Sequence, residues 1–272
     1  MVAGFYYCIR EVPELKQKTH EAIASGIEPI TISYKKINSC EYGKTFALYT
    51  EMVLNSTALG ELKPEKYEVV AERTVRSEKL AIWGITYAMR AIGKLRESGI
   101  EIDFIAIRCP ARAAKESFAR TVERLFIKND FSDGDNICLV FPNSILYEDS
   151  AVIKKGFDIF RRLKVKTMIS DFGDEYCPVM RFANYPFDYA MVSTSPGKTI
   201  QNSSTTAVES LNLLIKNFGA RTIATEPEGT AANEELTRAG FFGYLAKEPF
   251  KSLSEVIDDL KEVDENGSIE KQ

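Results

Sequence analysis

The hydrophobic and polar positions early in the chain alternate with the period of a β-strand. Ile30–Tyr34 alternates apolar and polar side chains and is rich in β-branched residues, which predicts a strand. Thr45–Leu54 predicts a second strand, and Tyr42 and Gly43 supply a turn between the two. Two strands joined by a short turn predict an antiparallel hairpin.

Three helical patterns flank this hairpin. Residues 14–25 end at Gly26, residues 64–74 begin with a proline, and residues 77–98 begin with a serine and end before Gly99. Proline is favoured at the first position of a helix, serine at its N-cap, and glycine just after its last turn. We therefore expect one helix before the hairpin and two after it.

From residue 102 onwards, apolar runs of strand length alternate with segments of helical periodicity. The predicted strands are Ile102–Ile107, Ile137–Phe141, Val165–Ile169, Phe187–Val192, Arg221–Thr225 and Phe242–Leu245. The predicted helices that follow them are Ala111–Ile127, Ser150–Leu163, Cys177–Asn184, Ser204–Phe218, Ala232–Ala239 and Ser252–Lys261.

Repeated strand–helix units with short connections predict an α/β protein with a parallel sheet. Together with the hairpin they give about eight strands, which suits a closed (β/α)8 barrel in a chain of 272 residues. The expected fold class is a modified TIM (β/α)8 barrel with an opening antiparallel hairpin strand. We expect a single domain over residues 12–262, with flanking tails at residues 1–11 and 263–272.

The composition excludes several classes of protein. The chain is 44% hydrophobic and 27% charged, as soluble globular proteins are, and its formal net charge of -4 argues against a general nucleic-acid-binding surface. No apolar run reaches the ~18 residues of a membrane helix, and no basic segment precedes the first apolar residues, so neither a membrane span nor a signal peptide is expected. The 5 cysteines form no CxxC pair, which is typical of reduced thiols in a cytoplasmic protein.

Two familiar catalytic arrangements are also missing from the sequence. The single histidine, His20, lies in a polar helical segment far from other candidate residues, and one histidine provides neither a catalytic triad nor a zinc ligand set. Ser195–Thr199 resembles a phosphate-binding loop, but Val192 stands where that motif needs a glycine. We therefore expect neither histidine-dependent hydrolysis nor P-loop nucleotide binding.

A candidate metal ligand ends the predicted strand within residues 167–175. The strand terminates in Asp171, and the chain breaks at Gly173. The carboxyl ends of the strands surround the active site in α/β barrels, so Asp171 could bind a divalent cation. Such cations prefer several convergent carboxylates. In the alternative interpretation, Asp171 is structural and caps the following turn.

The other predicted strand ends offer Asp171 few acidic partners. They carry Tyr49 or Glu51, Arg108, Val140 or Asn143, Met191, Glu226 or Glu228, and Phe242. Arg108 brings a cation to the same edge, and with Arg112 it could clamp a phosphate or a carboxylate. Alternatively, Arg108 pairs with Asp171 or Glu226 and closes the barrel mouth.

Several stretches carry a recognisable set of motifs. Ile169–Tyr176 is similar to LDDFGTGY, Tyr185–Val192 to LPVDYLKID, and Phe242–Pro249 to QGYLFGRP. Ala22–Ile37 is similar to an opening helix followed by an ELYYQPI strand, and Pro64–Glu72 to a PAEFIPLAEE helix. In this order and spacing they resemble the EAL domain family, the phosphodiesterases that linearise cyclic di-GMP. The resemblance implies a modified TIM barrel whose first strand runs antiparallel to the others.

The resemblance also implies a site with two Mg²⁺ or Mn²⁺ ions, held by carboxylates and one asparagine, and a lysine that supports the attacking water. The positions that match this metal and catalytic set are Tyr49, Arg108, Val140, Ser170, Asp171, Met191 and Glu226. Only Asp171 and Glu226 keep the acid of the family. The family's ligand-contacting glutamines fall on Lys35 and Phe242, and the arginine after its signature motif falls on Val53.

The match therefore predicts a degenerate member of the family whose vestigial site carries no metal cofactor. Arg108 in place of a neutral ligand adds a repulsion of about 4 kcal/mol per unit charge at 4 Å with an effective dielectric constant of 20. A one-residue shift of the match brings in Glu51 or Glu228, but it does not restore the family's residues at Val140, Met191 and Arg108 together. We expect a catalytically inactive domain that acts through a protein partner or senses a ligand without cleaving it.

Two alternatives stay open. In the first, the domain still binds cyclic di-GMP, with Lys35, Arg108 or Arg112 contacting the phosphates. In the second, it keeps a one-metal phosphodiesterase activity in which Asp171, Glu226 and Glu51 hold the metal. The resemblance also implies a homodimer that pairs through the loop beginning at Asp174, while the protein partner itself is not identified by the sequence.

Overall fold

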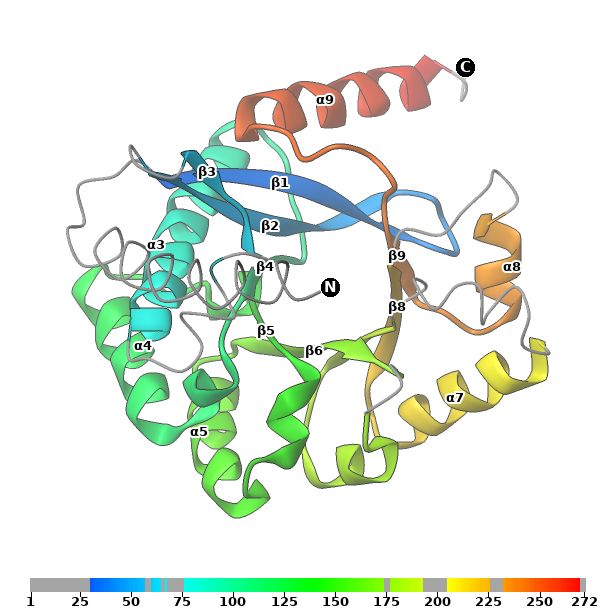
Figure 1. Cartoon of the computed structure of the whole chain (residues 1–272). Helices are drawn as coiled ribbons and strands as arrows, with labels where there is room; N and C mark the ends of the chain where they lie inside the picture. The colour runs from blue at the N-terminus through cyan, green and yellow to red at the C-terminus, as the bar shows by residue number, and fades with distance from the viewer. Residues whose placement is uncertain are drawn as a thin grey trace, which may run out of the picture.

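The computed structural model describes residues 30–56, 60–64, 67, 76–173, 177–192, 205–225 and 232–269. Within these residues, a sheet runs in the order β1-β9-β8-β7-β6-β5-β4-β2-β3, and an additional pairing of β1 with β2 closes it into a barrel (Figure 1). The strands are β1 (Ile30–Ser39), β2 (Thr45–Ser56), β3 (Gly60–Leu62), β4 (Phe104–Arg108), β5 (Ile137–Phe141), β6 (Lys166–Phe172), β7 (Tyr189–Val192), β8 (Arg221–Thr225) and β9 (Gly243–Leu245).

The direction of β1 differs from that of the rest of the barrel. It is antiparallel to both of its neighbours, β2 and β9, whereas the other neighbouring strands around the barrel are parallel. The predicted modified (β/α)8 barrel with an opening antiparallel hairpin strand is therefore confirmed. The short strand β3, antiparallel to the end of β2, was not predicted, because three residues are too few to show a periodic pattern.

Helices surround the barrel (Figure 1). The described α-helices are α3 (Arg76–Glu97), α4 (Glu116–Lys128), α5 (Ser150–Arg162), α7 (Thr205–Asn217), α8 (Ala232–Arg238) and α9 (Leu253–Ile269). The described 3-10 helices are η1 (Ala111–Ala114), η2 (Gly134–Asn136), η3 (Asn143–Tyr147) and η4 (Val179–Asn184). No helix among these has the length and apolar character needed to cross a bilayer.

Two of the predicted helices need correction. The helix expected over residues 111–127 divides at Lys115, whose extended backbone, with ψ at 156°, separates η1 from α4. The helix expected to end near Lys261 continues to Ile269. The polar residues that suggested a tail from residue 263 are compatible with a helix, since polarity alone does not end one.

Two other predicted helices fall largely where the structure gives no description. Residues 14–25 lie outside the described residues. Of the helix predicted over residues 64–74, only Pro64 and Tyr67 are described, and both are helical.

The barrel interior is filled with side chains. One buried cluster contains Ile37, Ala47, Tyr49, Phe104, Ala106, Cys138, Val140, Met168, Tyr189, Met191, Ile223 and Leu245. A second and larger cluster lies between the strands and the surrounding helices. Because a barrel of this kind is packed through its centre and is not a pore, a ligand site is expected at the end of the barrel where the parallel strands terminate.

The segment after β9 attaches α9 to the outside of the hairpin. Lys251 and Tyr34 exchange two backbone hydrogen bonds with N···O distances of 2.7 and 2.9 Å. Asp259 of α9 lies 2.6 Å from Nζ of Lys251 and 3.2 Å from Nζ of Lys36. The hydrogen bond from Lys251, together with that from Lys36, lowers the pKa of the Asp259 carboxyl.

Asp259→Asn is expected to lower the free energy of unfolding at neutral pH by less than about 1 kcal/mol, because partly exposed ion pairs are screened. A carboxyl whose pKa is lowered in the folded state stabilises the fold above its unfolded pKa of about 3.9, and this stabilisation is lost as the pH falls through the folded pKa. In urea denaturation, the difference between the variant and the wild type should therefore shrink between about pH 7 and about pH 3.

Asp258→Asn is the matched control for this prediction. Asp258 is the neighbouring exposed acid and has no ion pair within the part of the chain that the structure describes. Its substitution should leave the unfolding free energy nearly unchanged at both pH values. An equal loss in the two variants would show that the attachment of α9 does not depend on Asp259.

Candidate functional site

The carboxyl ends of the parallel strands meet at one end of the barrel. Tyr49 of β2, Val140 of β5 and Met191 of β7 point into the barrel and are only 6%, 2% and 3% exposed. Arg108 is the last residue of β4 and lies in register with Val140. Ser170 of β6 is also buried and lines a cavity together with Arg108 and Val140. The structure thus brings five of the seven positions predicted from the family resemblance to one end of the barrel.

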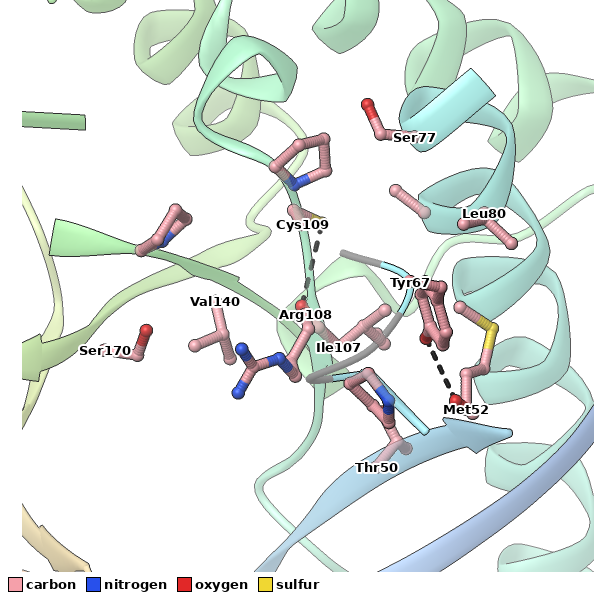
Figure 2. Close-up of a pocket in the computed structure, with 14 residues that line it drawn as sticks. Thr50, Met52, Tyr67, Ser77, Leu80, Ile107, Arg108, Cys109, Val140 and Ser170 are labelled. Carbon is pink, nitrogen blue, oxygen red and sulfur yellow. Dashed lines mark hydrogen bonds between the residues drawn. The ribbon is translucent and has the colours of Figure 1, made fainter. Parts of the chain in front are cut away.

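Arg108 binds a residue of this same set. Its Nη1 donates a hydrogen bond to Tyr49 Oη at 3.2 Å, which links the ends of β4 and β2. Figure 2 shows the guanidinium on the same side of β4 as Val140 and Ser170. A cation and a phenol therefore meet where the family resemblance implies a carboxylate and an asparagine.

The carboxylate of Asp171 forms a hydrogen bond within its own strand, β6. Its Oδ2 accepts a hydrogen bond from Ser170 Oγ at 2.8 Å. Within the described residues it forms no ion pair with Arg108. The other partner predicted for Arg108, Glu226, lies outside the described residues. The turn that Asp171 was predicted to cap continues into residues 174–176, which lie outside the described residues, so the cap stays a prediction.

The backbone of Asp171 is unusual. Its φ of 55° lies in the left-handed region, and the pairing of β6 with β7 shifts register between Ile169 and Phe172. Asn143 Nδ2 donates to the carbonyl oxygen of Asp171 at 3.1 Å, which connects the segment after β5 to the end of β6. A bulge that leaves one residue out of the regular pairing turns the strand and redirects its side chains, and here it leaves Asp171 exposed.

The two other predicted ligand-binding cations lie in different places. Lys35 of β1 is paired in register with Tyr49, is 6% exposed, and holds its Nζ 4.6 Å from the centre of the Phe250 ring. It therefore belongs to the same end of the barrel as Arg108. Arg112, on η1, donates from Nε to Glu78 of α3 at 2.8 Å and is not among the described residues that line the cavity. The structure does not bring Arg112 together with Arg108.

Several predicted positions lie outside the described residues. These are Glu226, Glu228 and the loop that begins at Asp174. Glu51 is described and, by alternation along β2, lies on the same strand face as Tyr49.

A centre for Mg²⁺ or Mn²⁺ needs several convergent oxygen ligands. Among the described residues, no group of three or more histidine, cysteine, aspartate or glutamate side chains converges. Val140 and Met191 offer no oxygen ligand, and the cation of Arg108 repels a second cation. The described residues at this end of the barrel therefore do not fit a two-metal centre.

Among the described cysteines, Cys40 and Cys138 are poor nucleophiles. No disulfide joins the four described cysteines, Cys40, Cys109, Cys138 and Cys177, as their spacing predicted. Burial raises the pKa of the Cys40 thiol to about 11 and raises that of Cys138 well above its ordinary value. A thiolate nucleophile at either position is therefore not expected at neutral pH.

A cavity of about 90 Å³ extends from the barrel end toward α3 (Figure 2). The described residues that line it are Thr50, Met52, Pro64, Tyr67, Ser77, Leu80, Ala81, Ile107, Arg108, Cys109, Pro110, Val140, Pro142 and Ser170. Sequence reasoning missed this cavity because it followed only the positions that match the catalytic set. The signal that could have indicated it is the apolar side chain at Ile107, which precedes Arg108 on β4 and therefore faces outward toward the helices.

Comparison with known proteins agrees with this geometry. The family model for the EAL domain matches residues 22–242. The chain belongs to the EAL domain family. A search of curated proteins finds no match to it.

Solved EAL structures share its fold at low sequence identity. The cAMP- and cyclic di-GMP-bound form of the EAL enzyme Bd1971 is 18% identical with a TM-score of 0.81, over 95% of this chain and 71% of that one. The PaMucR phosphodiesterase in complex with cyclic di-GMP is 15% identical with a TM-score of 0.77, over 89% and 99% of the two chains. The FimX EAL domain of Xanthomonas citri in complex with cyclic di-GMP is 12% identical with a TM-score of 0.73, over 91% and 97%.

Proposed function

We propose that this EAL domain does not hydrolyse cyclic di-GMP and acts in the cytoplasm through a protein partner, or by sensing a ligand that it leaves intact. Its membership of the family supports a role in signalling of the cyclic di-GMP type. Two-metal hydrolysis requires a convergent set of acids. Among the described residues of this domain, no such set is found.

The observation that carries the proposal is the hydrogen bond from Arg108 to Tyr49 at the end of the barrel. A guanidinium is always charged at physiological pH, so it opposes a divalent cation at the same place. Val140 and Met191 fill neighbouring strand ends with apolar side chains that cannot ligate Mg²⁺ or Mn²⁺. Together these side chains support a barrel end that has lost metal chemistry and kept its packing.

The second candidate function is binding of cyclic di-GMP without hydrolysis. The three solved relatives described above are complexes with that dinucleotide, and Lys35 and Arg108 bring two cations to the same end of this barrel. Phosphodiester groups are anions, and arginine binds them through paired hydrogen bonds. The third candidate, one-metal hydrolysis, draws support from relatives whose names call them an enzyme and a phosphodiesterase.

The test is a hydrolysis assay of the purified chain with cyclic di-GMP and millimolar Mg²⁺ or Mn²⁺. We expect no linear dinucleotide above the protein-free blank, either from the wild type or from Asp171→Ala. PaMucR phosphodiesterase in the same buffer supplies the positive control. Metal-dependent product from the wild type that disappears in Asp171→Ala would overturn the proposal and favour the one-metal enzyme.

Calorimetric titration with cyclic di-GMP in the same buffer separates the two non-hydrolysing functions. Heat that saturates at micromolar ligand, without product, identifies a cyclic di-GMP sensor, and the heat should decrease in Arg108→Met. Absence of heat up to high micromolar ligand leaves the protein-partner function.

We further propose that the domain pairs as a homodimer through the loop that begins at Asp174.

A further inference from the structure

The cavity beside Arg108 has walls from three separately packed hydrophobic clusters. Met52 and Leu80 belong to a cluster beside β3. Ile107 belongs to the cluster between the strands and the helices, and Val140 to that of the barrel interior. Figure 2 shows Met52 and Leu80 across β4 from the guanidinium of Arg108. The exposed fractions of Met52, Leu80 and Ile107 are 9%, 4% and 1%, so these side chains form a buried apolar end of the cavity.

A close contact between α3 and the strands holds these walls apart. A Cβ added at Gly84 of α3 would lie 2.7 Å from Cγ2 of Ile107 and 3.8 Å from Sδ of Met52, so the helix backbone packs directly on both side chains at this point. The cavity lies about one helical turn nearer the N-terminus of α3, at Leu80 and Ala81. Because the contact at Gly84 already fixes the distance between the helix and Ile107, α3 cannot move inward to fill the cavity.

The polar side chains that line the cavity already have partners. They are Thr50, Tyr67, Ser77, Arg108, Cys109 and Ser170, each of which makes at least one interaction of its own. Thr50 Oγ1, for example, donates to the carbonyl oxygen of Ala106 at 2.8 Å. Among the residues that the structure describes, the buried side-chain atom without a hydrogen bond is Asn212 Oδ1, and Asn212 does not line the cavity. A water molecule in a cavity needs roughly two to four polar partners, and none of these described side chains is left unpaired to provide them.

The size of the cavity limits the ligand. Its volume of about 90 Å³ is smaller than the ~150 Å³ apolar cavity that holds benzene. In proportion to the carbon atoms of benzene, a ligand of roughly three to four carbon atoms fits. Pro64, Pro110 and Pro142 also line the cavity, and proline has no backbone N–H that could bind a polar group of the ligand.

We propose that this cavity binds a small uncharged hydrocarbon, held by van der Waals contact with Met52, Leu80 and Ile107. Removal of the ligand's apolar surface from water favours binding, and contact with close-packed walls adds dispersion attraction. Binding requires neither the charge of Arg108 nor any of its hydrogen-bond donors. The proposal rests on the proposed function in one respect, since it gives the ligand class of the sensing role.

The proposal is tested by titrating the full chain with isobutene and following its methionine methyl groups by NMR after 13C labelling. We expect a saturable shift of the Met52 methyl signal within the solubility of isobutene. Met168 is buried in the barrel interior and Met180 is 72% exposed, and neither lines the cavity, so their methyl signals should not change. The midpoint of thermal unfolding should rise with isobutene concentration.

Acetamide is the matched polar ligand. It has the same trigonal shape and the same number of non-hydrogen atoms as isobutene, but its amide would be buried without a partner. It should therefore bind at least about tenfold more weakly. Both ligands are compared on the wild type, so this result does not depend on the folding of any variant.

Ala81→Leu adds apolar atoms at a cavity wall where the native side chain is 1% exposed. By occupying the space of the ligand, it should weaken isobutene binding at least about tenfold. Ala151→Leu makes the same change at an exposed position of α5 and should leave isobutene binding unchanged. Circular dichroism of each variant verifies that it is folded before binding is compared.

No saturable shift of the Met52 methyl signal, equal binding of acetamide, or undiminished binding in folded Ala81→Leu would each overturn the proposal. None of these results restores hydrolysis, so failure here leaves the proposed function standing. Metal-dependent cleavage of cyclic di-GMP would instead overturn the proposed function, whatever the outcome with isobutene.

Discussion

Phe172→Ala is expected to lower the free energy of unfolding by about 3–5 kcal/mol, the usual cost of emptying a buried aromatic site. Phe172 ends β6 and has no exposed surface. The centroid of its ring lies 4.8 Å from that of Phe182. The Phe182 ring in turn stacks on Phe187 with a centroid distance of 5.6 Å. The substitution would leave a cavity at the junction of the barrel and the η4 segment. Urea denaturation followed by circular dichroism measures the loss.

Asp171→Gly is the matched control, one residue away. Asp171 is exposed and adopts a left-handed φ of 55°, a conformation that costs most L-residues about 1–2 kcal/mol and costs glycine almost nothing. The variant should be as stable as the wild type or up to about 1 kcal/mol more stable. If Asp171→Gly proved more damaging than Phe172→Ala, the Asp171 carboxylate with its hydrogen bond from Ser170 would stabilise the fold more than the buried Phe172 ring does.

The strands were the most predictable part of the fold. Ile137–Phe141 and Arg221–Thr225 have the predicted bounds, because a continuous apolar or β-branched run between polar turns has few other solutions. The helix over residues 111–127 was predicted whole, yet it divides at Lys115. That division depends on the packing of η1 against α5, which no local pattern in the sequence records.

The candidate site was predictable in its positions and not in its contacts. Strand alternation and motif spacing placed Tyr49 and Arg108 at one end of the barrel, and the register confirms that placement. The partners of the arginines could not be inferred in the same way. Arg112 binds Glu78, a residue on a helix that the spacing of the catalytic motifs does not place, because long side chains reach whichever neighbour the tertiary packing brings near.

These two levels of predictability bear on function. The fold of the EAL family is specified by apolar patterns that tolerate many substitutions, so it persists at 12–18% identity to the three solved relatives. A metal site depends instead on a few residue types at fixed points. A chain can therefore keep the barrel while the side chains at its carboxyl end change, and Arg108, Val140 and Met191 differ here from the residues that the family resemblance implies.

Gly156→Ala is expected to lower the free energy of unfolding by about 3 kcal/mol, at the upper end of the usual cost of overpacking. Gly156 is buried on α5 where the helix crosses η1. A Cβ at this position would lie 2.0 Å from the carbonyl oxygen of Ala114 and 3.0 Å from the carbonyl carbon of Lys115. Both are backbone atoms, so relief requires one whole element to move away from the other.

Gly93→Ala tests whether the loss comes from this close approach. Gly93 is an exposed residue of α3, and a Cβ added there would meet nothing within 4 Å. Alanine is a better helix former than glycine by about 1 kcal/mol, so this variant should be slightly more stable. Because η1 follows directly after Arg108, Cys109 and Pro110, a shifted η1 in Gly156→Ala should also disturb the end of β4. Equal stability of the two variants would show that α5 and η1 can separate without cost, and that Gly156 does not set the position of η1 next to Arg108.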